Sequence, residues 1–528
     1  MNASDSKTLE SYYPYWGKAS GNSDENPLQY HLLVYHCLDV AAVGRTLLMK
    51  DHHLCEKIIS PILQRNDEAD KDRALNLITT LLALHDIGKF SGRFQNLRPD
   101  IMDTLQGRTC ENGYTVYHDD MGRLLFEADL WKRAWSEDWF GLDRSADPLD
   151  WKDALRAWIF AVTGHHGKPP ENPKNALTGN MLFDKEERNA AVAFATACTR
   201  FFLNNPSHHE ILKFTEDTRD EFCRTSWLFA GLAVLSDWIG SDRSHFPFCS
   251  EPMPLDKYWA HALHYAEDAV HDAGILPARV SEKTGMIGLF PGKSPTPLQS
   301  YVSACELGKI RSPRLFIIEE ATGSGKTEAA IVLAQRLIAA GMGEGIFFGL
   351  PTMATADAMY GRMDEAYLNL FVCEDHPSLV LAHSSRNLSN KFRNSIIPVN
   401  DAFIEPDRNG EVSGSAQCAA WLSDNRKKSL LAQIGVGTID QALIGVLPLR
   451  HQSLRLLGLS RNILVVDEVH AYDPYVHKLL GTLLEFHAAQ GGSAILLSAT
   501  LPKKQRQELI IEFCRGLGAD ARDRKSVV

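Results

Sequence analysis

The spacing of apolar residues divides this chain into two kinds of sequence. In the first half, apolar side chains recur every three or four positions over long segments, the spacing of helices with one buried face. In the second half, short apolar runs alternate with helical segments, a pattern typical of buried parallel strands covered by helices on both faces. The pattern therefore predicts a mainly α-helical domain followed by an α/β domain with a parallel sheet.

The helical half contains several segments with clear periodicity. Gly88 is well placed to end one of them, because glycine readily adopts the left-handed conformation that closes many helices. Residues 90–150 are less regular, although Val116–Asp120 precedes a further apolar-periodic segment. The predicted helices are 28–50, 74–87, a run at 158–162 and 222–239.

Histidines and aspartates interrupt these apolar segments. Taken singly they have ordinary explanations: His36 is a core histidine bonded to a carbonyl, and Asp237 is a helix-end carboxylate facing solvent. However, two histidines between glycines in 163–167 suit a turn that presents imidazoles, and a carboxylate inside an apolar helix is costly without a partner or a cation. Taken together, they indicate one pocket whose candidate ligands are His36, His85, Asp86, His118, His165, His166 and Asp237.

The chemistry of this set favours metal ions. Imidazole-rich ligation suits transition ions of the Fe, Mn, Co or Ni class better than magnesium or calcium, which prefer oxygen ligands. Seven ligands suit two ions, with one carboxylate bridging them. Two ions ~3.5–4 Å apart can activate a water and stabilise the leaving oxygen in phosphoester hydrolysis. Lys89 either adds positive charge beside a phosphate or is a solvated lysine after a helix end, and the two readings weigh equally.

A stretch rich in glycine and proline separates the halves. It covers 273–298 and is the clearest boundary in the chain. We therefore expect a metal-binding helical domain at 1–272, an ATP-binding lobe at 299–514 and a tail at 515–528.

The second half carries a phosphate-binding loop, Thr322-Gly323-Ser324-Gly325-Lys326-Thr327, between an apolar run and the predicted helix 328–340. The glycines let backbone N–H groups approach phosphates, Lys326 supplies a point charge, and Thr327 can hold Mg2+. The strict eight-residue pattern of such a loop begins with glycine, and here Glu320 occupies that first position. The apolar runs that predict strands are 315–318, 346–348, 379–381, 430–434, 463–466 and 494–497.

Two further motifs lie at predicted strand ends. Asp467 and Glu468 can hold Mg2+ and polarise the attacking water, whereas Ser498-Ala499-Thr500 can relay the nucleotide state to DNA contacts. The phosphate loop and these two motifs occur in the order typical of a superfamily 2 helicase, so this half resembles the RecA-like lobe of that class. The resemblance implies coupling through His470 and adenine recognition by Gln299, for which a polar residue at a helix N-terminus is the other explanation. It also implies DNA-backbone contacts, for which ordinary turns are an equally good explanation, at Pro351, Thr352, Thr438 and Asp440.

Composition bears on the kind of partner the protein binds and on the compartment in which it works. The net charge of −11 gives no overall electrostatic footprint for nucleic acid, and leaves room for a local basic channel. Ten cysteines without a C-x-x-C pair argue against a zinc ribbon or a disulfide framework, and indicate a reducing, cytoplasmic setting. The first residues are polar, so they are no signal peptide, and no apolar run is long enough to span a bilayer.

The histidine-rich half resembles the HD phosphohydrolase superfamily. The forms His85-Asp86-Ile87-Gly88-Lys89 and Thr163–Gly167 are similar to the nuclease domain of the type I CRISPR-associated helicase–nuclease, an antiviral defence enzyme. The resemblance implies endonucleolytic cutting of single-stranded DNA and recruitment by an RNA-guided surveillance complex. It assigns the first ion to residues His36, His85, Asp86 and Asp237, and the second to Asp86, His118, His165 and His166.

The family's second helicase lobe, which delivers arginines to ATP, has no counterpart in these 528 residues. We expect either a truncated sequence or a separate polypeptide that supplies the lobe, and slow or no ATP hydrolysis by this chain alone. Two alternatives stay open: an HD phosphohydrolase acting on nucleotides with a regulatory ATPase lobe, and a non-catalytic fragment that competes for the surveillance complex.

Overall fold

The computed structural model forms two compact units, each of which is described by itself. The first comprises residues up to 49 together with 58–272, and the second comprises 50–57 and the described residues from 273 onward. The residues that the structure describes are 10–20, 28–65, 67–167, 169–170, 179–203, 212–307, 312–372, 375, 377–382, 430–449 and 451–518.

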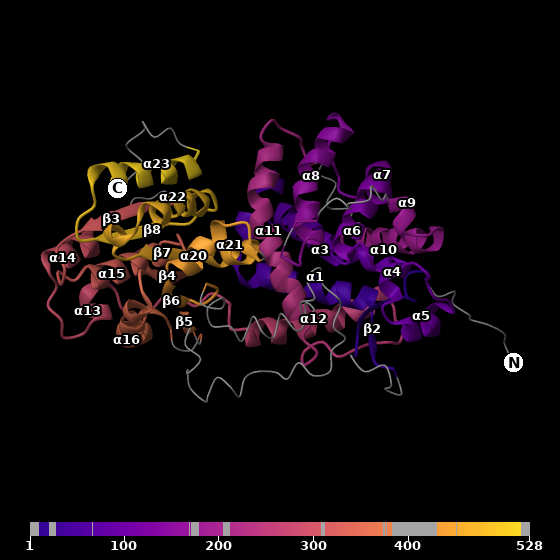
Figure 1. Ribbon diagram of the computed structural model, residues 1–528, viewed down its shortest axis with the longest axis horizontal. Helices are drawn as coiled ribbons and strands as arrows, with labels where there is room; N and C mark the ends of the chain where they lie inside the picture. Colours follow the sequence, from indigo (N-terminus) through magenta and orange to yellow (C-terminus); the bar gives the residue numbers. More distant parts are fainter. Residues whose placement is uncertain are drawn as a thin grey trace. The chain divides into compact units, whose positions relative to one another are not determined.

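The first unit is a bundle of helices, as the periodicity predicts (Figure 1). Its longest helices carry broad buried faces, and α8 packs along α11, where the Trp158 indole donates to Thr225 Oγ1 at 3.1 Å. The main helices are α1 (Leu33–Lys50), α3 (Glu68–Ala83), α5 (Pro99–Gln106), α6 (His118–Leu125), α7 (Trp131–Ser136), α8 (Pro148–Thr163), α10 (Lys185–Leu203), α11 (Thr218–Gly240) and α12 (Leu255–Asp272).

The first predicted helix begins later than expected. Residues Tyr30–Leu32 form strand β2, which pairs antiparallel with β1 (Trp16–Ala19), and α1 begins only at Leu33. The expected start at residue 28 was therefore wrong, because the backbone groups of this stretch bond to another strand rather than along a helix. The pairing places β1 against the first turns of α1.

The second predicted helix ends earlier than expected. It stops at Ala83, and His85 and Asp86 lie in a turn before the short 3-10 helix η2 (Ile87–Phe90). Gly88 is not among the glycines with positive φ, so it does not close the helix in the left-handed conformation. A Cβ there would lie 1.9 Å from the His118 carbonyl oxygen, so glycine is required by close packing against α6.

The second unit contains a six-stranded sheet in the order β3-β8-β7-β4-β6-β5, with every pair parallel. Parallel pairing leaves the carboxyl ends of all strands along one edge, which is where ligands bind in open α/β sheets. The strands are β3 (Leu315–Glu319), β4 (Gly345–Leu350), β5 (Leu379–Ala382), β6 (Ile434–Thr438), β7 (Asn462–Val466) and β8 (Ala494–Ser498).

Helices cover both faces of this sheet (Figure 1). Alternate strand residues enter two cores: Ile463 and Val465 face one, and Leu464 and Val466 face the other. One core is closed by α13 (Gly285–Leu289), α15 (Lys326–Ala339) and α16 (Met353–Leu370). The other is closed by α20 (Asp440–Leu443), α21 (Gln452–Arg461), α22 (Pro474–Ala489) and α23 (Lys503–Gly516).

One predicted strand is displaced along the sequence. The run at 430–434 was expected as a strand, but β6 begins only at Ile434. Residues before it form a turn held by side chains: Asn462 Nδ2 donates to the Leu430 carbonyl at 2.9 Å, and Gln433 bonds to Ser378. The apolar run is therefore buried as a turn against the core, which an apolar pattern alone does not distinguish from a strand.

Two segments outside 299–514 belong to the second unit. Residues 273–298, expected as a connection, contribute Met286, Leu289 and Phe290 to its core. Residues 50–57 contribute Asp51, whose carboxylate lies 2.8 Å from Arg461 Nε, and Arg461 also pairs with Glu344 at 2.8 Å. Among the described helices of either unit, none has the length and apolar character needed to cross a bilayer.

Candidate metal centre and nucleotide site

Five elements of the first unit bring the seven predicted ligands together. His36 comes from the first turn of α1, His118 from the start of α6, and Asp237 from the last turn of α11. His85 and Asp86 lie in the turn after α3, and His165 and His166 lie in the turn after α8. Three overlapping triads have ligand atoms within 4.8 Å of one another: His118, His165 and His166; His36, His85 and Asp237; and His85, Asp86 and His165.

Asp86 stands at the middle of this cluster. Its Oδ2 lies 3.2 Å from His36 Nε2 and 3.4 Å from His85 Nε2. Its Oδ1 lies 3.2 Å from His118 Nε2 and 3.4 Å from His165 Nε2. Each carboxylate oxygen thus faces a different pair of imidazoles, the arrangement expected of a carboxylate shared by two ions.

The remaining two ligands, Asp237 and His166, each lie near a different pair of imidazoles. Asp237 Oδ1 is 3.4 Å from His36 Nε2 and 3.8 Å from His85 Nε2, so it joins the first pair. His166 Nε2 is 2.8 Å from His118 Nε2, so it joins the second. The distances thus form two sets, one on the side of His36 and one on the side of His118.

Hydrogen bonds set which ring nitrogens point inward. His85 Nδ1 lies 3.0 Å from the Leu82 carbonyl, and His165 Nδ1 lies 3.1 Å from the Val162 carbonyl. A carbonyl only accepts, so Nδ1 of each ring carries the proton and Nε2 keeps its lone pair. In metalloproteins such outer bonds fix the ligand tautomer and orientation.

The buried polar atoms of the cluster fit metal ions. Neither ring nitrogen of His36 has a hydrogen-bond partner, and neither does His85 Nε2, although all three are shielded from solvent. Buried polar atoms without partners are rare, because leaving them unpaired costs free energy. Here His85 Nε2 lies 3.4 Å from Asp86 Oδ2, and a cation between these two acceptor atoms would remove their repulsion.

The charges of the cluster favour ligation. Burial lowers the pKa of His36 to about 4 and also lowers the pKa of His85, so these imidazoles stay neutral at pH 7. Burial alone would raise the pKa of Asp86, but Lys89 and the surrounding histidines hold that pKa well below its ordinary value. Burial opposes ionisation of Asp237 too, and Lys18 and His36 hold its pKa well below the ordinary value. Neutral imidazoles and ionised carboxylates are the forms that bind metals.

The structure places Lys89 against the cluster rather than in solvent. Its ammonium lies 2.7 Å from Asp86 Oδ2, and its side chain is 2% exposed. The reading of Lys89 as a solvated lysine is therefore wrong.

Two neighbours of the cluster were not singled out in the sequence analysis. Lys18 on β1 lies 3.8 Å from Asp237 Oδ1, and the Tyr114 hydroxyl lies 3.0 Å from His118 Nδ1. Tyr114 precedes His118 by one helical turn's length of chain, which is the only local hint of its role. Lys18 belongs to a strand that the periodicity did not predict.

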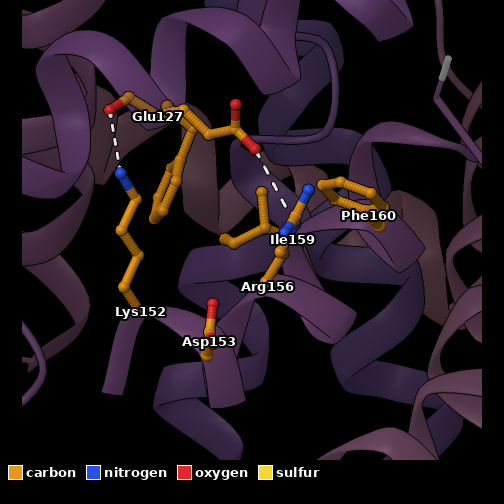
Figure 2. Close-up of a pocket in the computed structure, with 7 residues that line it drawn as sticks. Glu127, Lys152, Asp153, Arg156, Ile159 and Phe160 are labelled. Carbon is orange, nitrogen blue, oxygen red and sulfur yellow. Dashed lines mark hydrogen bonds and ion pairs between the residues drawn. The ribbon is translucent and has the colours of Figure 1, made fainter. Parts of the chain in front are cut away.

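The first unit also has a surface cavity of about 290 Å³ beside α8 (Figure 2). Glu127 lies between two cations there: Lys152 Nζ donates to its carbonyl at 3.4 Å, and Arg156 Nε is 3.9 Å from its carboxylate. None of the predicted site residues lines this cavity. The cavity therefore does not include the metal centre.

In the second unit the phosphate loop joins β3 to α15. Gly323 and Gly325 have φ of 82° and 87°, which residues with a Cβ rarely adopt. Lys326 Nζ donates to the carbonyls of Glu320 and Ala321, at 2.7 and 3.0 Å, so the ammonium lies within the loop. Ser324 completes the loop, and Thr322 precedes its first glycine.

The order of the strands brings the other motifs beside this loop. β8 lies between β3 and β7, so Ser498 at the end of β8 lies next to Asp467, which follows β7. His470 Nδ1 is 3.2 Å from Ser498 Oγ, which joins the two motifs. Glu468 has φ of 50°, a strained conformation for a non-glycine residue that is concentrated at functional sites.

The structure also places the weaker predicted residues. Gln299 Nε2 donates to the Gly325 carbonyl at 3.1 Å, so its side chain lies against the phosphate loop. Pro351 and Thr352 follow β4, and the neighbouring strand β6 ends at Thr438, two residues before Asp440. These residues share the carboxyl edge of the sheet with the nucleotide motifs.

Arg362 on α16 is a further residue of this edge that the sequence did not indicate. Its Nη1 lies 3.2 Å from Thr327 Oγ1, and its Nη2 lies 2.9 Å from Glu328 Oε1. It therefore holds the hydroxyl that was predicted to bind Mg2+.

The fold and the two sites define a helical HD-type domain joined to a nucleotide-binding helicase lobe. Family models agree: residues 16–246 match the HD domain of Cas3, and residues 296–509 match the DEAD/DEAH box helicase domain. The chain therefore contains an HD domain of the Cas3 type followed by a DEAD/DEAH box helicase domain.

Named relatives support this assignment. The chain is 35% identical to the CRISPR-associated endonuclease/helicase Cas3 of Escherichia coli K12, over 96% of this chain and 56% of that protein. It is 30% identical to the Cas3 of Thermus thermophilus, over 94% of this chain and 50% of that protein. The chain thus spans about half the length of the curated relatives it matches.

Solved structures share the fold. A crystal structure of a CRISPR-associated protein superposes with a TM-score of 0.76 at 29% identity, covering 97% of this chain and 54% of the other. T. fusca Cas3 superposes with a TM-score of 0.72 at 26% identity, covering 96% and 52%. An HD domain and a helicase domain imply, in general terms, the use of divalent metal ions and of nucleotides.

Proposed function

We propose that the first unit is a two-metal endonuclease that cuts single-stranded DNA. The observation that carries this proposal is Asp86, because each of its carboxylate oxygens faces a separate pair of imidazole Nε2 atoms. A single ion would engage one pair of imidazoles and leave the carboxylate oxygen that faces the other pair without a cation. The E. coli and T. thermophilus relatives are named endonuclease/helicases, and the proposal extends the endonuclease activity in those names to this chain.

The seven ligands have distinct roles in this proposal. His36, His85 and Asp237 hold the first ion, whereas His118, His165 and His166 hold the second, with Asp86 shared by both. When bound, two divalent ions of the Fe, Mn, Co or Ni class would supply the electrostatic stabilisation that phosphodiester hydrolysis requires. Six of the seven ligands are buried, which limits the access of bulk water, and Lys89 offsets the charge of the shared carboxylate.

The second unit is proposed to bind ATP with Mg2+. Lys326 would turn from the loop carbonyls to the terminal phosphates, Thr327 and Asp467 would hold the metal, and Glu468 would orient the attacking water. A structure of T. fusca Cas3 with AMPPNP, 25% identical and with a TM-score of 0.71, supports this use of the fold. Gln299 would read the adenine from its position against the loop.

ATP turnover by this chain alone is expected to be slow or absent. Arginines delivered by a second lobe can accelerate such reactions by several orders of magnitude, and the described second unit contains one sheet. We propose that a separate polypeptide supplies the second lobe. DNA-stimulated turnover at ordinary motor rates by the purified chain contradicts this proposal.

The proposed setting is antiviral defence in the cytoplasm. There an RNA-guided surveillance complex of a type I CRISPR system would recruit the protein to displaced single-stranded DNA. The relatives are named CRISPR-associated nuclease/helicases, which supports this setting. Pro351, Thr352, Thr438 and Asp440 would contact the DNA backbone, because they share one edge of the sheet.

One experiment separates the proposal from its rivals. The purified chain is loaded with Mn2+, Fe2+, Co2+ or Ni2+, its metal content is measured, and nicking of circular single-stranded DNA is followed with and without ATP. We expect two ions per chain and nicking without ATP. Degradation of free nucleotides but not of DNA identifies a nucleotide phosphohydrolase, and metal binding without any hydrolysis identifies a non-catalytic fragment.

A matched variant assigns any activity to its unit. Lys326→Ala removes the ammonium of the phosphate loop and is expected to abolish binding of a fluorescent ATP analogue. Because this residue belongs to the other unit, metal content and ATP-independent nicking should equal those of the parent. Loss of ATP-independent nicking in this variant contradicts the assignment of nicking to the first unit.

A further inference from the structure

Each of the two carboxylates of the metal centre is accompanied by one lysine. Lys89 lies 2.7 Å from Asp86 Oδ2, and Lys18 lies 3.8 Å from Asp237 Oδ1. The two ammonium groups differ in access, since the Lys89 side chain is 2% exposed and that of Lys18 is 20% exposed. Lys89 is enclosed with its carboxylate, whereas Lys18 reaches both the cluster and the solvent.

The position of Lys18 is set by strand β1. Gly17 lies against α1, where a Cβ would come within 2.9 Å of Leu33 Cα and 3.2 Å of His36 Cβ. The register of β1 with β2 shifts between Trp16 and Lys18, which marks a β-bulge at Gly17. Bulges re-aim side chains, and here Trp16 is buried while Lys18 points to Asp237.

A buried glutamine fixes this strand to the turn of the metal centre. Gln95 Oε1 accepts from the Trp16 backbone N–H at 3.0 Å, and Gln95 Nε2 donates to the Trp16 carbonyl at 3.0 Å. The same Nε2 also donates to the Lys89 carbonyl at 2.8 Å. The backbone that carries Lys18 is thus held in place, and only its side chain is free to adjust.

Partly exposed side chains adjoin both ligand sets of the cluster. Of the seven ligands, six are buried and His166 is partly exposed. His166 belongs to the second ligand set, while Lys18 adjoins Asp237 of the first. A phosphodiester that approaches the centre would therefore meet a cation at the side of Asp237.

We propose that Lys18 is a substrate-binding residue of the metal centre, which contacts a non-bridging phosphate oxygen of the DNA on the Asp237 side. This inference rests on the proposed nuclease function. The ammonium is a compact charge on a flexible stem, so it can leave a carboxylate engaged by an ion and pair with a phosphate nearby. Lys89 has no such freedom, because its side chain is enclosed.

The test compares Lys18→Ala and Lys18→Arg with the parent and with Lys132→Ala, which removes an exposed lysine on α7. Binding of a fluorescent single-stranded oligonucleotide to metal-loaded protein is measured from low to high salt, together with metal content and nicking. For Lys18→Ala we expect parental metal content, roughly ten-fold weaker DNA binding, and a salt dependence shallower by about 0.7 in log–log slope, the contribution of one phosphate contact. Lys18→Arg should recover the slope, and Lys132→Ala should resemble the parent.

Two results overturn the inference. Lys18→Ala with parental DNA affinity and salt slope shows that the ammonium does not meet the phosphate. Lower metal content in Lys18→Ala, with parental affinity per loaded molecule, shows that Lys18 serves only to hold Asp237. A parent that binds two ions but neither binds nor cuts DNA is a separate outcome, which refutes the proposed function itself.

Discussion

His36 Nε2 lies 3.2 Å from Asp86 Oδ2, although α1 supplies one residue and the turn after α3 supplies the other. The histidine is neutral, since burial lowers its pKa to about 4, and neither of its nitrogens has a hydrogen-bond partner. A neutral imidazole held beside a carboxylate without a hydrogen bond is a poor structural contact. It is a suitable pair of ligands for a cation between them.

Asp86→Ala should lose both metal ions, because this carboxylate is the one group that faces both sets of imidazoles. We expect nicking to fall by more than the roughly 10–100-fold that follows loss of an outer hydrogen-bond partner of a ligand. Elemental analysis and the nicking assay check this. Asp103→Ala, an exposed aspartate on α5, is the matched control. Parental nicking by Asp86→Ala would falsify the assignment of the metal centre.

Tyr114→Phe should weaken the second ion selectively. The Tyr114 hydroxyl lies 3.0 Å from His118 Nδ1 and accepts from the His118 backbone N–H at 2.9 Å, so it orients both the ring and the start of α6. Loss of such a partner is expected to lower metal affinity about 10–100-fold. Titration of metal-free protein should show one weakened site, with nicking recovered at excess metal. The exposed Tyr475→Phe controls for loss of a hydroxyl, and two equally weakened sites contradict the selective role.

Gly88→Ala should destabilise the first unit. The added Cβ would lie 1.9 Å from the His118 carbonyl oxygen and 2.6 Å from the Gly122 nitrogen, and neither backbone atom can rotate away. We expect a loss of at least about 1–3 kcal/mol in the free energy of unfolding, the usual scale of overpacking. Denaturant unfolding measures it. Gly361→Ala, where a Cβ meets no atom within 4 Å, should be neutral or slightly stabilising, and equal effects of the two changes would disprove the steric argument.

His487 should make the second unit sensitive to acid. Burial lowers its pKa from 6.5 to about 4, and its ring bonds to the Ser493 carbonyl at 3.0 Å. Below pH 6.5 the unfolded chain binds a proton that the folded unit does not, so stability falls as the pH drops from about 6.5 towards about 4 and is constant above that range. Between pH 7 and pH 5 the expected loss is ~2 kcal/mol.

Unfolding by urea at the two pH values checks the role of His487. His487→Gln removes the titrating group, so the difference between pH 7 and pH 5 should shrink relative to the parent. His264→Gln, at an exposed position on α12, should leave the difference unchanged. A pH dependence that is the same in His487→Gln and the parent would show that other groups cause it.

The sequence was informative where a residue type conflicts with its surroundings. His36 and Asp237 stand out because imidazole and carboxylate are costly in apolar helices, and the phosphate loop stands out because its glycines and lysine are adjacent. Both kinds of signal involve residues that are close together in the sequence, so they can be recognised without knowledge of the fold.

Residues placed by long-range pairing gave no such signal. Lys18 meets Asp237 only because β1 pairs with β2 and bulges at Gly17, and the strand is too short to show a period. Arg362 reaches Thr327 only after α16 has packed beside the sheet. The close approach of Gly88 to α6 gave no signal either, since it is a tertiary contact that periodicity does not contain.

The grouping of Asp51 with Arg461 and Glu344 bears on how this protein can be dissected. A fragment that begins at residue 273 would carry the guanidinium and the Glu344 carboxylate but not Asp51, which belongs to the same unit. Removing one member of a buried charge group typically costs about 3–5 kcal/mol. The second unit is therefore not separable by a single cut, and its independent study requires the eight residues 50–57 to be joined to it.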